Sequence, residues 1–244
     1  MSGKTRLDSL LVKRGLAANQ EEAQAYIGAG KVLVDTRADY KAGSLVPSDC
    51  EIILKKTSRY VSRGGYKLEK GLSHFELDPA GWICADIGCS NGGFTDCLLQ
   101  KGAGRVYCVD VGYGILDWKL RQDKKVVVLE RTNARYLDRD HIPESLDLAV
   151  IDASFISLKQ LLPPLLPLFA ETVRIVALVK PQFELPRDLV GPGGVVRSHE
   201  LHEQALAMAT RFGTSLGLVS RGSVASPICG IKGNQEFLVY FTSG

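Results

Sequence analysis

From residue 82 onward, short apolar segments alternate with longer segments of helical periodicity. The apolar segments are WICADIG, RVYCVDV, KVVVLE, LDLAVID and VRIVALVK. Strands separated by helix-length segments favour a mainly parallel sheet with helices on both faces. SHELHEQALAMATRFGTSLG then predicts a late helix that begins after Ser198, and GLVSRGSVAS and EFLVYF predict a closing pair of strands. We therefore expect a doubly wound, mostly parallel, Rossmann-like α/β domain over residues 64–244.

The first sixty residues follow a different pattern. RLDSLLVKRGL and QEEAQAYIGAG predict two short helices, and KVLVD and EIIL predict strands. TSRYVSRGG is polar and contains glycine, which is typical of a linker. We expect a small α+β domain over residues 1–58 and a linker over 59–63.

The basic residues are concentrated at the N-terminal end. Residues 1–63 contain 11 Lys/Arg and 7 Asp/Glu, out of 30 and 27 in the whole chain. The remaining residues are therefore slightly acidic. This asymmetry favours a module that binds a polyanion, and a solvated basic surface is the alternative.

Several classes of protein are disfavoured. The segment MSGKTRLDSLLVKRG interrupts every apolar stretch with a charge, so we expect no signal peptide, and no segment is apolar enough to span a membrane. The six cysteines form no CxxC pair, which indicates buried thiols in a reducing cytoplasm. His199 and His202 have no third ligand at a suitable spacing, so no metal site is expected. We expect a cytoplasmic protein without a membrane or an obligate protein partner.

The segment ADIGCSNGGFTDCLL indicates a ligand pocket at the end of the first strand. Its spacing lacks the GxGxxG pattern of dinucleotide-binding enzymes. Asp110 ends the next strand, where a carboxylate can accept hydrogen bonds from a ribose diol, although nicotinamide enzymes place an acid there too. The candidate cofactor-binding residues in these two segments are Asp86, Gly88, Ser90, Gly92, Gly93 and Asp110.

Four ionisable residues lie far apart in the sequence, each at the edge of an apolar run. They are Lys67 in SRGGYKL, Asp152 in VIDASFISL, Lys180 in ALVKPQFE and Glu236 in GNQEFLVY. Strand and helix ends of an α/β sheet direct side chains into a shared cleft. Two lysines and two carboxylates that meet there could deprotonate a poor nucleophile, and a buried salt-bridge network without catalysis is the alternative.

Resemblance to known families makes the expected function more specific. DIGCSNGGFTDCLLQ resembles the S-adenosylmethionine-binding motif of methyltransferases, and the body resembles ribose 2′-O-methyltransferases of the FtsJ/RrmJ type. With VDVGYGILDWKLR, ERTNAR, DASFISL, LVKPQFE, GPGGVVR and GNQEFLVYF, nearly the whole chain resembles the TlyA family of haemolysin-named ribosomal RNA methyltransferases. The resemblance implies S-adenosylmethionine as cofactor, with Asn133 and Asp152 among its contacts. It also implies a catalytic tetrad of Lys67, Asp152, Lys180 and Glu236.

The N-terminal segment resembles the RNA-binding domain named after small-subunit ribosomal protein S-four. The match covers about residues 4–56 and departs at Asn19-Gln20, where that family usually has Ser-Arg. It implies that ribosomal RNA or ribosomal subunits are the partner. The RNA-binding residues implied by the match are Arg6, Lys13, Arg14 and Lys31.

The chemistry of a ribose hydroxyl accounts for the residue types. The hydroxyl is a weak acid and a weak nucleophile, so a base such as Lys180 is needed, with Lys67 as neighbouring cation. Asp152 would position the lysines but oppose the neutral form of Lys180, and Glu236 would organise the cluster. We expect cytidine 2′-O-methylation of ribosomal RNA. The alternatives are an RNA-binding protein without turnover and a membrane-active haemolysin.

Overall fold

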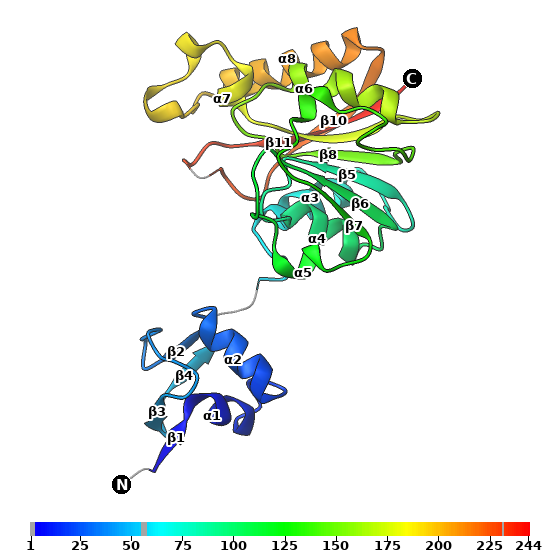
Figure 1. Cartoon of the computed structure of the whole chain (residues 1–244). Helices are drawn as coiled ribbons and strands as arrows, with labels where there is room; N and C mark the ends of the chain where they lie inside the picture. The colour runs from blue at the N-terminus through cyan, green and yellow to red at the C-terminus, as the bar shows by residue number, and fades with distance from the viewer. Residues whose placement is uncertain (1–2, 55–57, 231) are drawn as a thin grey trace. The chain divides into compact units, whose positions relative to one another are not determined.

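The computed structural model describes residues 3–54, 58–230 and 232–244, and the chain divides into two compact units, Met1–Arg59 and Tyr60–Gly244 (Figure 1). The division therefore falls between Arg59 and Tyr60, whereas the sequence placed a linker over 59–63. Tyr60 is buried, and the Val61 amide donates a 2.8 Å hydrogen bond to Asp96 Oδ2. These contacts attach the segment after Arg59 to the second unit.

The second unit is built on one large sheet. In the described part of the chain its strands follow the order β10-β11-β9-β8-β5-β6-β7. Strands β5 to β9 run parallel, and β11 is antiparallel to both β9 and β10. The strands are β5 (Ile83–Ile87), β6 (Arg105–Val109), β7 (Val126–Leu129), β8 (Leu148–Ile151), β9 (Arg174–Val179), β10 (Leu218–Ala225) and β11 (Phe237–Ser243). This architecture confirms the expected doubly wound, mostly parallel sheet and its closing strand pair.

Helices cover both faces of the sheet (Figure 1). One face carries α3 (Gly64–His74), α4 (Gly93–Gln100) and α5 (Trp118–Arg121). The other carries α6 (Leu158–Leu165), α7 (Pro181–Glu184) and α8 (His199–Ser215). Short 3-10 turns η1 (Ala134–Tyr136), η2 (Leu166–Leu168), η3 (Arg187–Leu189) and η4 (Pro192–Gly194) complete the connections.

Two separate cores follow from the alternation of side chains along each strand. In β5, Cys84 joins the core under α3 and α4, whereas Ala85 joins the core under α6 and α8. Both faces of the central strands are buried, so their sequences are almost wholly apolar. Asp86 is the exception in β5, and the reason lies in the site described below.

Local signals account for several boundaries. Ser198 is the N-cap of α8, as predicted, and accepts a hydrogen bond from the Leu201 amide. Five of the six free cysteines are buried, as expected, and Cys229 is exposed. No helix in the described residues has both the length and the apolar character needed to cross a bilayer.

The first unit packs two helices against two small antiparallel strand pairs. The helices are α1 (Leu7–Lys13) and α2 (Gln20–Gly28), where the sequence predicted them. The strands are β1 (Lys4–Arg6), β2 (Val32–Val34), β3 (Leu45–Pro47) and β4 (Ile52–Leu54), with β1 paired to β3 and β2 to β4. Leu7, Leu10 and Leu11 of α1 form the core with Val34 and Val46. This unit matches the expected small α+β region.

Candidate active site

The sheet brings the four dispersed ionisable residues to one edge. Asp152 directly follows β8, and Lys180 directly follows β9. Glu236 directly precedes β11. Because β11 runs antiparallel to β9, the start of β11 lies at the edge where the parallel strands end, and Phe237 pairs there with Val179. Lys67 lies in the first turns of α3. We call these four residues the tetrad.

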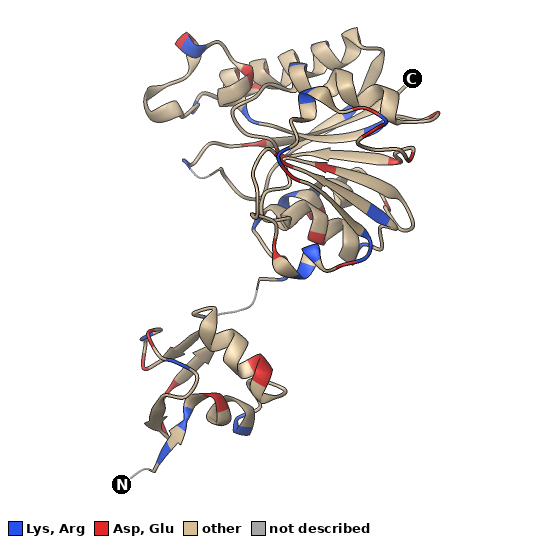
Figure 2. Cartoon of the chain, viewed as in Figure 1, with Lys and Arg blue, Asp and Glu red and all other residues tan. Residues whose placement is uncertain are grey.

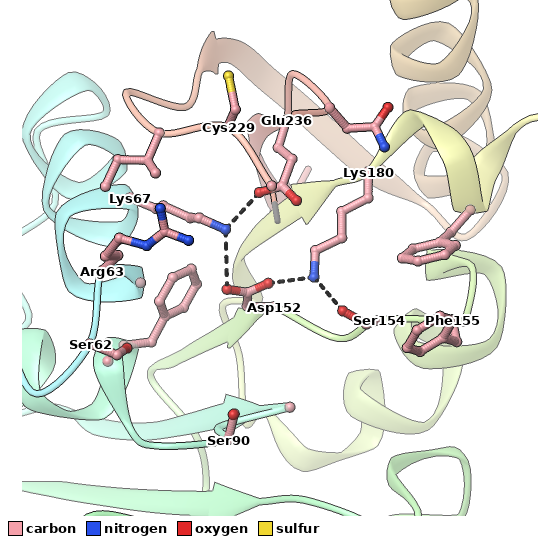
Figure 3. A pocket seen from close by; sticks show the side chains of 18 of the residues that line it. Ser62, Arg63, Lys67, Ser90, Asp152, Ser154, Phe155, Lys180, Cys229 and Glu236 are labelled. Carbon is pink, nitrogen blue, oxygen red and sulfur yellow. Dashed lines mark hydrogen bonds and ion pairs between the residues drawn. The ribbon is translucent and has the colours of Figure 1, made fainter. Parts of the chain in front are cut away.

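The tetrad forms a continuous chain of ionic contacts (Figure 3). Lys67 Nζ lies 2.6 Å from Glu236 Oε2 and 3.8 Å from Asp152 Oδ2. Lys180 Nζ lies 2.6 Å from Asp152 Oδ1 and donates a 2.9 Å hydrogen bond to Ser154 Oγ. The two carboxylates therefore alternate with the two ammonium groups, and each lysine has its own close acidic partner.

All four side chains are largely withdrawn from solvent. Their exposed fractions are 12% for Lys67, 20% for Asp152, 7% for Lys180 and 4% for Glu236. Buried charges are tolerated when they are paired and hydrogen-bonded, and this cluster carries two positive and two negative formal charges. Its polar atoms open into a cavity of about 790 Å³, which we call the tetrad cavity.

The glycine loop after β5 forms another wall of the tetrad cavity. Asp86, Gly88, Ser90 and Gly93 line it, as does Asp152. Gly88 has φ +80°, and a Cβ there would lie 2.9 Å from the Ala153 Cα. The loop after β8 thus approaches the glycine loop more closely than any side chain would permit.

One of the predicted cofactor-binding glycines, Gly92, does not line the tetrad cavity, although its neighbours Asn91 and Gly93 do. Gly92 is the N-cap of α4 and has φ +89°. Its Cα packs against the side chains of Leu116 and Leu120, where a Cβ would lie 2.3 Å from a Leu120 methyl group. Its position indicates a role in shaping the turn.

A second cavity of about 510 Å³ adjoins the first and shares Gly88, Ser90 and Asp152 with it. Asp110 and Asn133 line this adjacent cavity. Asp110 Oδ2 accepts a 2.9 Å hydrogen bond from the Ser90 amide, and its Oδ1 accepts one of 2.7 Å from Gly112. These bonds fix the carboxylate at the end of β6, with the glycine loop beside it.

The two cavities lie where the strand order reverses. β5 has β6 on one side and β8 on the other, and ligands of open α/β sheets bind beyond the carboxyl ends of strands at such a point. Asp86, Asp110 and Asp152 end or follow neighbouring strands there. The predicted cofactor and catalytic residues therefore meet at one place, except for Gly92.

Comparison with known proteins gives the family. A family model described as FtsJ-like methyltransferase matches residues 60–243. The 16S/23S rRNA (cytidine-2′-O)-methyltransferase TlyA of Mycobacterium tuberculosis (strain H37Rv) is 44% identical over 242 residues, covering 98% of this chain and 90% of that protein. The chain belongs to the TlyA family of FtsJ-like methyltransferases.

Other relatives carry a different name. Hemolysin A of Brachyspira hyodysenteriae is 37% identical over 238 residues, covering 97% of this chain and 99% of that protein. A solved structure of a hemolysin-named protein from Streptococcus thermophilus superposes with a TM-score of 0.75 at 42% identity, covering 100% of this chain and 90% of that one. The family thus includes proteins named for two different activities.

Members of this methyltransferase family depend on S-adenosylmethionine, and the residues present here fit that ligand. Asp86 Oδ2 accepts hydrogen bonds from the amide and hydroxyl of Thr95, at 2.9 and 2.7 Å. Asp86 Oδ1 is buried without a partner and belongs to a residue that lines the tetrad cavity. A buried carboxylate oxygen left unpaired is costly, and the ammonium group of the ligand's methionine portion would supply the donor it lacks.

We predict that S-adenosylmethionine affinity depends on pH through Asp86. Burial raises the pKa of Asp86 to about 7. An aspartate in an unfolded chain titrates near pH 4, so the ligand-free protein should lose stability as pH rises from about 4 to about 7. A cationic ligand group favours the ionised carboxylate, so affinity should increase from pH of about 6 to about 8, with proton release on binding.

Isothermal titration calorimetry in buffers of different ionisation enthalpy measures both the affinity for S-adenosylmethionine and the number of protons released on binding. Asp86→Asn should bind more weakly and lose the pH dependence. Equal wild-type affinity at the two ends of this pH range would contradict the prediction.

The sequence did not single out the residues that hold the tetrad loops in place. Glu184 accepts hydrogen bonds from Ser157 Oγ (2.6 Å) and the Leu158 amide (2.9 Å), which ties the loop after Lys180 to the loop after Asp152. Asn234 Nδ2 donates to the Gly194 carbonyl (2.8 Å) and its Oδ1 accepts from the Val196 amide (2.8 Å). These links are not visible in sequence, because each joins segments at least 26 residues apart.

In the first unit, two of the four predicted RNA-binding cations are engaged within the unit itself. Arg6 pairs with Asp8 through bonds of 3.1 and 2.7 Å and holds the pKa of that carboxyl well below its usual range. Arg14 donates to the carbonyls of Cys50 and Ser48 at 2.8 and 2.7 Å. Basic and acidic residues are interspersed over this unit (Figure 2).

The other two predicted cations have fewer internal contacts in the described residues. Lys13 is exposed at the end of α1. Lys31 is half-buried, and its Nζ lies 5.9 Å from the centre of the Tyr26 ring. We infer that Lys13 and Lys31 are better placed than Arg6 and Arg14 to meet a phosphate.

Proposed function

We propose that this chain methylates the 2′-hydroxyl of a cytidine ribose in ribosomal RNA, with S-adenosylmethionine as methyl donor. The observation that carries the proposal is the tetrad, two lysines and two carboxylates linked by successive contacts of 2.6, 3.8 and 2.6 Å at the edge of a methyltransferase glycine loop. The relatives named as ribosomal RNA (cytidine-2′-O)-methyltransferases support the substrate.

Lys180 is the residue that meets the reacting hydroxyl. Its side chain is 7% exposed, and its ammonium group is oriented by Asp152 Oδ1 and Ser154 Oγ. These two partners fix the position of the nitrogen and leave its third direction for a substrate oxygen, where the lone pair of the neutral amine can accept the hydroxyl proton. Alignment of this kind removes much of the entropic barrier to transfer.

Lys67 and Glu236 balance the charge of Asp152. Lys67 lies between the two carboxylates, closer to Glu236, and its positive charge offsets part of the negative charge of Asp152. Glu236 therefore organises Lys67, and Asp152 organises Lys180. This division of roles is finer than the one expected from sequence, where Asp152 positioned both lysines.

The transfer releases one proton. S-adenosylmethionine supplies a methyl group on a sulfonium, so that the carbon–sulfur bond breaks as the carbon–oxygen bond to the ribose forms. Lys180, entering as the neutral amine, takes the proton of the 2′-hydroxyl and becomes an ammonium that Asp152 stabilises. Asp86, Gly88, Ser90 and Gly93 would hold the methionine portion, and Asp110 and Asn133 the nucleoside.

Mass spectrometry of RNA tests this function. Purified protein, S-adenosylmethionine and ribosomal subunits from cells lacking the enzyme should yield a cytidine with a methyl group on its ribose. A methyl group on a base would refute the chemistry. Cofactor binding without transfer to any ribosomal RNA would instead favour an RNA-binding protein without turnover.

We predict that residues 1–59 hold the RNA. A protein of residues 60–244 should bind ribosomal subunits at least about tenfold more weakly, because it loses the basic module and its phosphate contacts. It should retain affinity for S-adenosylmethionine, since both cavities are lined by the second unit. Filter binding and calorimetry measure the two affinities. Equal RNA affinity after truncation would refute the role of the first unit.

The double variant Lys13→Gln/Lys31→Gln gives a finer test in the full chain. It should weaken binding to subunits and reduce its salt dependence. The matched variant Lys41→Gln removes an exposed lysine in the loop before β3 and serves as the control. With ribosomal subunits as the proposed substrate, we also propose a cytoplasmic location.

A further inference from the structure

Two buried side-chain atoms of the described residues have no hydrogen-bond partner, and both belong to residues that line the tetrad cavity. They are Asp86 Oδ1 and Gln182 Oε1. Both atoms are acceptors. Because a buried unpaired acceptor costs free energy, such atoms are rare in folded proteins and point to a donor brought by a ligand.

The two acceptors belong to different walls of the cavity. Asp86 is the penultimate residue of β5 and accepts hydrogen bonds from Thr95 of α4, on the face of the sheet covered by α3 and α4. Gln182 lies in α7, two residues beyond Lys180, on the face covered by α6 and α8 (Figure 1). One ligand group on the glycine loop does not account for both, and the cavity has room for two ligands.

The surroundings of Gln182 suit a nucleobase. Phe183 follows it in α7 and packs against Phe155, with ring centres 5.2 Å apart. Both rings line the tetrad cavity. Phe155, which is labelled in Figure 3, is 90% exposed. A flat apolar wall next to a hydrogen-bonding amide is the arrangement by which enzymes hold an unstacked base.

We propose that Gln182 determines base specificity, with its Oε1 accepting a hydrogen bond from the 4-amino group of the target cytosine. The inference rests on the proposed function. The base is attached to the sugar carbon next to the one that bears the 2′-hydroxyl, so a ribose placed at Lys180 brings its base against a neighbouring wall. Lys180 and Gln182 are separated by one residue, which places the amide within that wall.

The acceptor distinguishes the two pyrimidines. Cytosine presents an N–H donor at position 4, whereas uracil presents a carbonyl oxygen there. With the amide oriented as it is in this structure, a carbonyl facing Gln182 Oε1 would leave two acceptors opposed. Sites built around a buried hydrogen-bonding group reject ligands that leave that group unpaired.

The test uses the full-length protein and a substitution that keeps the shape of the side chain. Gln182→Met removes the amide, and Gln204→Met, on the exposed side of α8, is the matched control. The substrates are ribosomal RNA with cytidine, uridine or the pyrimidin-2-one ribonucleoside at the methylated position, assembled into the subunit that the wild-type protein methylates. Initial rates give kcat/KM for each pair of enzyme and RNA.

We expect the wild type and Gln204→Met to prefer cytidine over the pyrimidin-2-one nucleoside, which lacks the amino group, by about 10- to 100-fold. Gln182→Met should lose about that factor on cytidine and little on the analogue, so its preference for cytidine over both other nucleosides disappears. Its melting temperature should be equal or higher, because the substitution removes an unpaired buried oxygen.

Two results would overturn the inference while leaving the proposed function intact. One is an unchanged preference for cytidine in Gln182→Met. The other is weaker binding of S-adenosylmethionine by that variant with nucleoside preference retained, which would assign the amide to the cofactor. Failure of the wild type to methylate ribosomal RNA would instead refute the proposed function itself.

Discussion

Lys180→Met is expected to lower the rate of methyl transfer by about 10²- to 10⁴-fold, the range lost when a positioned proton acceptor is removed. Methionine retains much of the volume of lysine but cannot take the proton of the ribose hydroxyl. Asp152 keeps Lys67 as a cationic neighbour at 3.8 Å, so the fold should persist. Mass spectrometry of ribosomal RNA after a timed reaction measures the loss.

The control is Lys159→Met, which removes an exposed lysine of α6 and should leave the rate unchanged. Affinity for S-adenosylmethionine should be similar in both variants. A Lys180→Met protein that keeps more than about a tenth of the wild-type rate would contradict the assignment of Lys180 as the base.

Glu236→Met is expected to destabilise the second unit by about 3 kcal/mol. Lys67 would lose the carboxylate 2.6 Å away and keep only Asp152, at 3.8 Å, while its own side chain stays 12% exposed. Removing the close partner of a buried charge is strongly unfavourable. The double variant Lys67→Met/Glu236→Met removes both charges. It should regain most of the lost stability, because apolar groups of similar size replace a buried ion pair at little cost.

The rates of methyl transfer by the two variants should show whether the Lys67–Glu236 pair acts in catalysis or only supports the fold. Both should be impaired, because Glu236→Met removes the carboxylate that positions Lys67, and the double variant leaves Asp152 without its opposing cation. Urea titrations give the unfolding free energies, and the same RNA assay gives the rates. Recovery of both stability and activity in the double variant would show that the pair only supports the fold.

The sequence predicted the features that depend on local periodicity and strand order. Asp152 and Lys180 follow apolar runs that were recognisable as parallel strands, so their arrival at one edge of the sheet could be expected. Predicting that Glu236 reaches the same edge requires one further inference, that the last strand runs antiparallel to its neighbours. The family resemblance added the methyl donor, which the motif around Gly88 alone leaves undecided between ligand classes.

The sequence could not give the features that depend on contacts between distant segments. The guanidinium group of Arg14 donates to the carbonyls of Cys50 and Ser48, 36 and 34 residues away in the sequence. The expectation that Arg14 contacts RNA stays a prediction. The lack of a partner for Gln182 Oε1 can be seen only once its neighbours are placed. The linker expected at 59–63 was likewise read from composition, whereas the burial of Tyr60 depends on the second unit.

The position of β11 between β9 and β10 has a consequence for the order in which the protein matures. A ribosome makes β11 after every other described strand of that sheet, although the strand occupies an interior place in it. During synthesis the sheet remains open between β9 and β10, and Glu236 has not yet reached Lys67. A nascent chain therefore has no complete tetrad until translation has passed the start of β11.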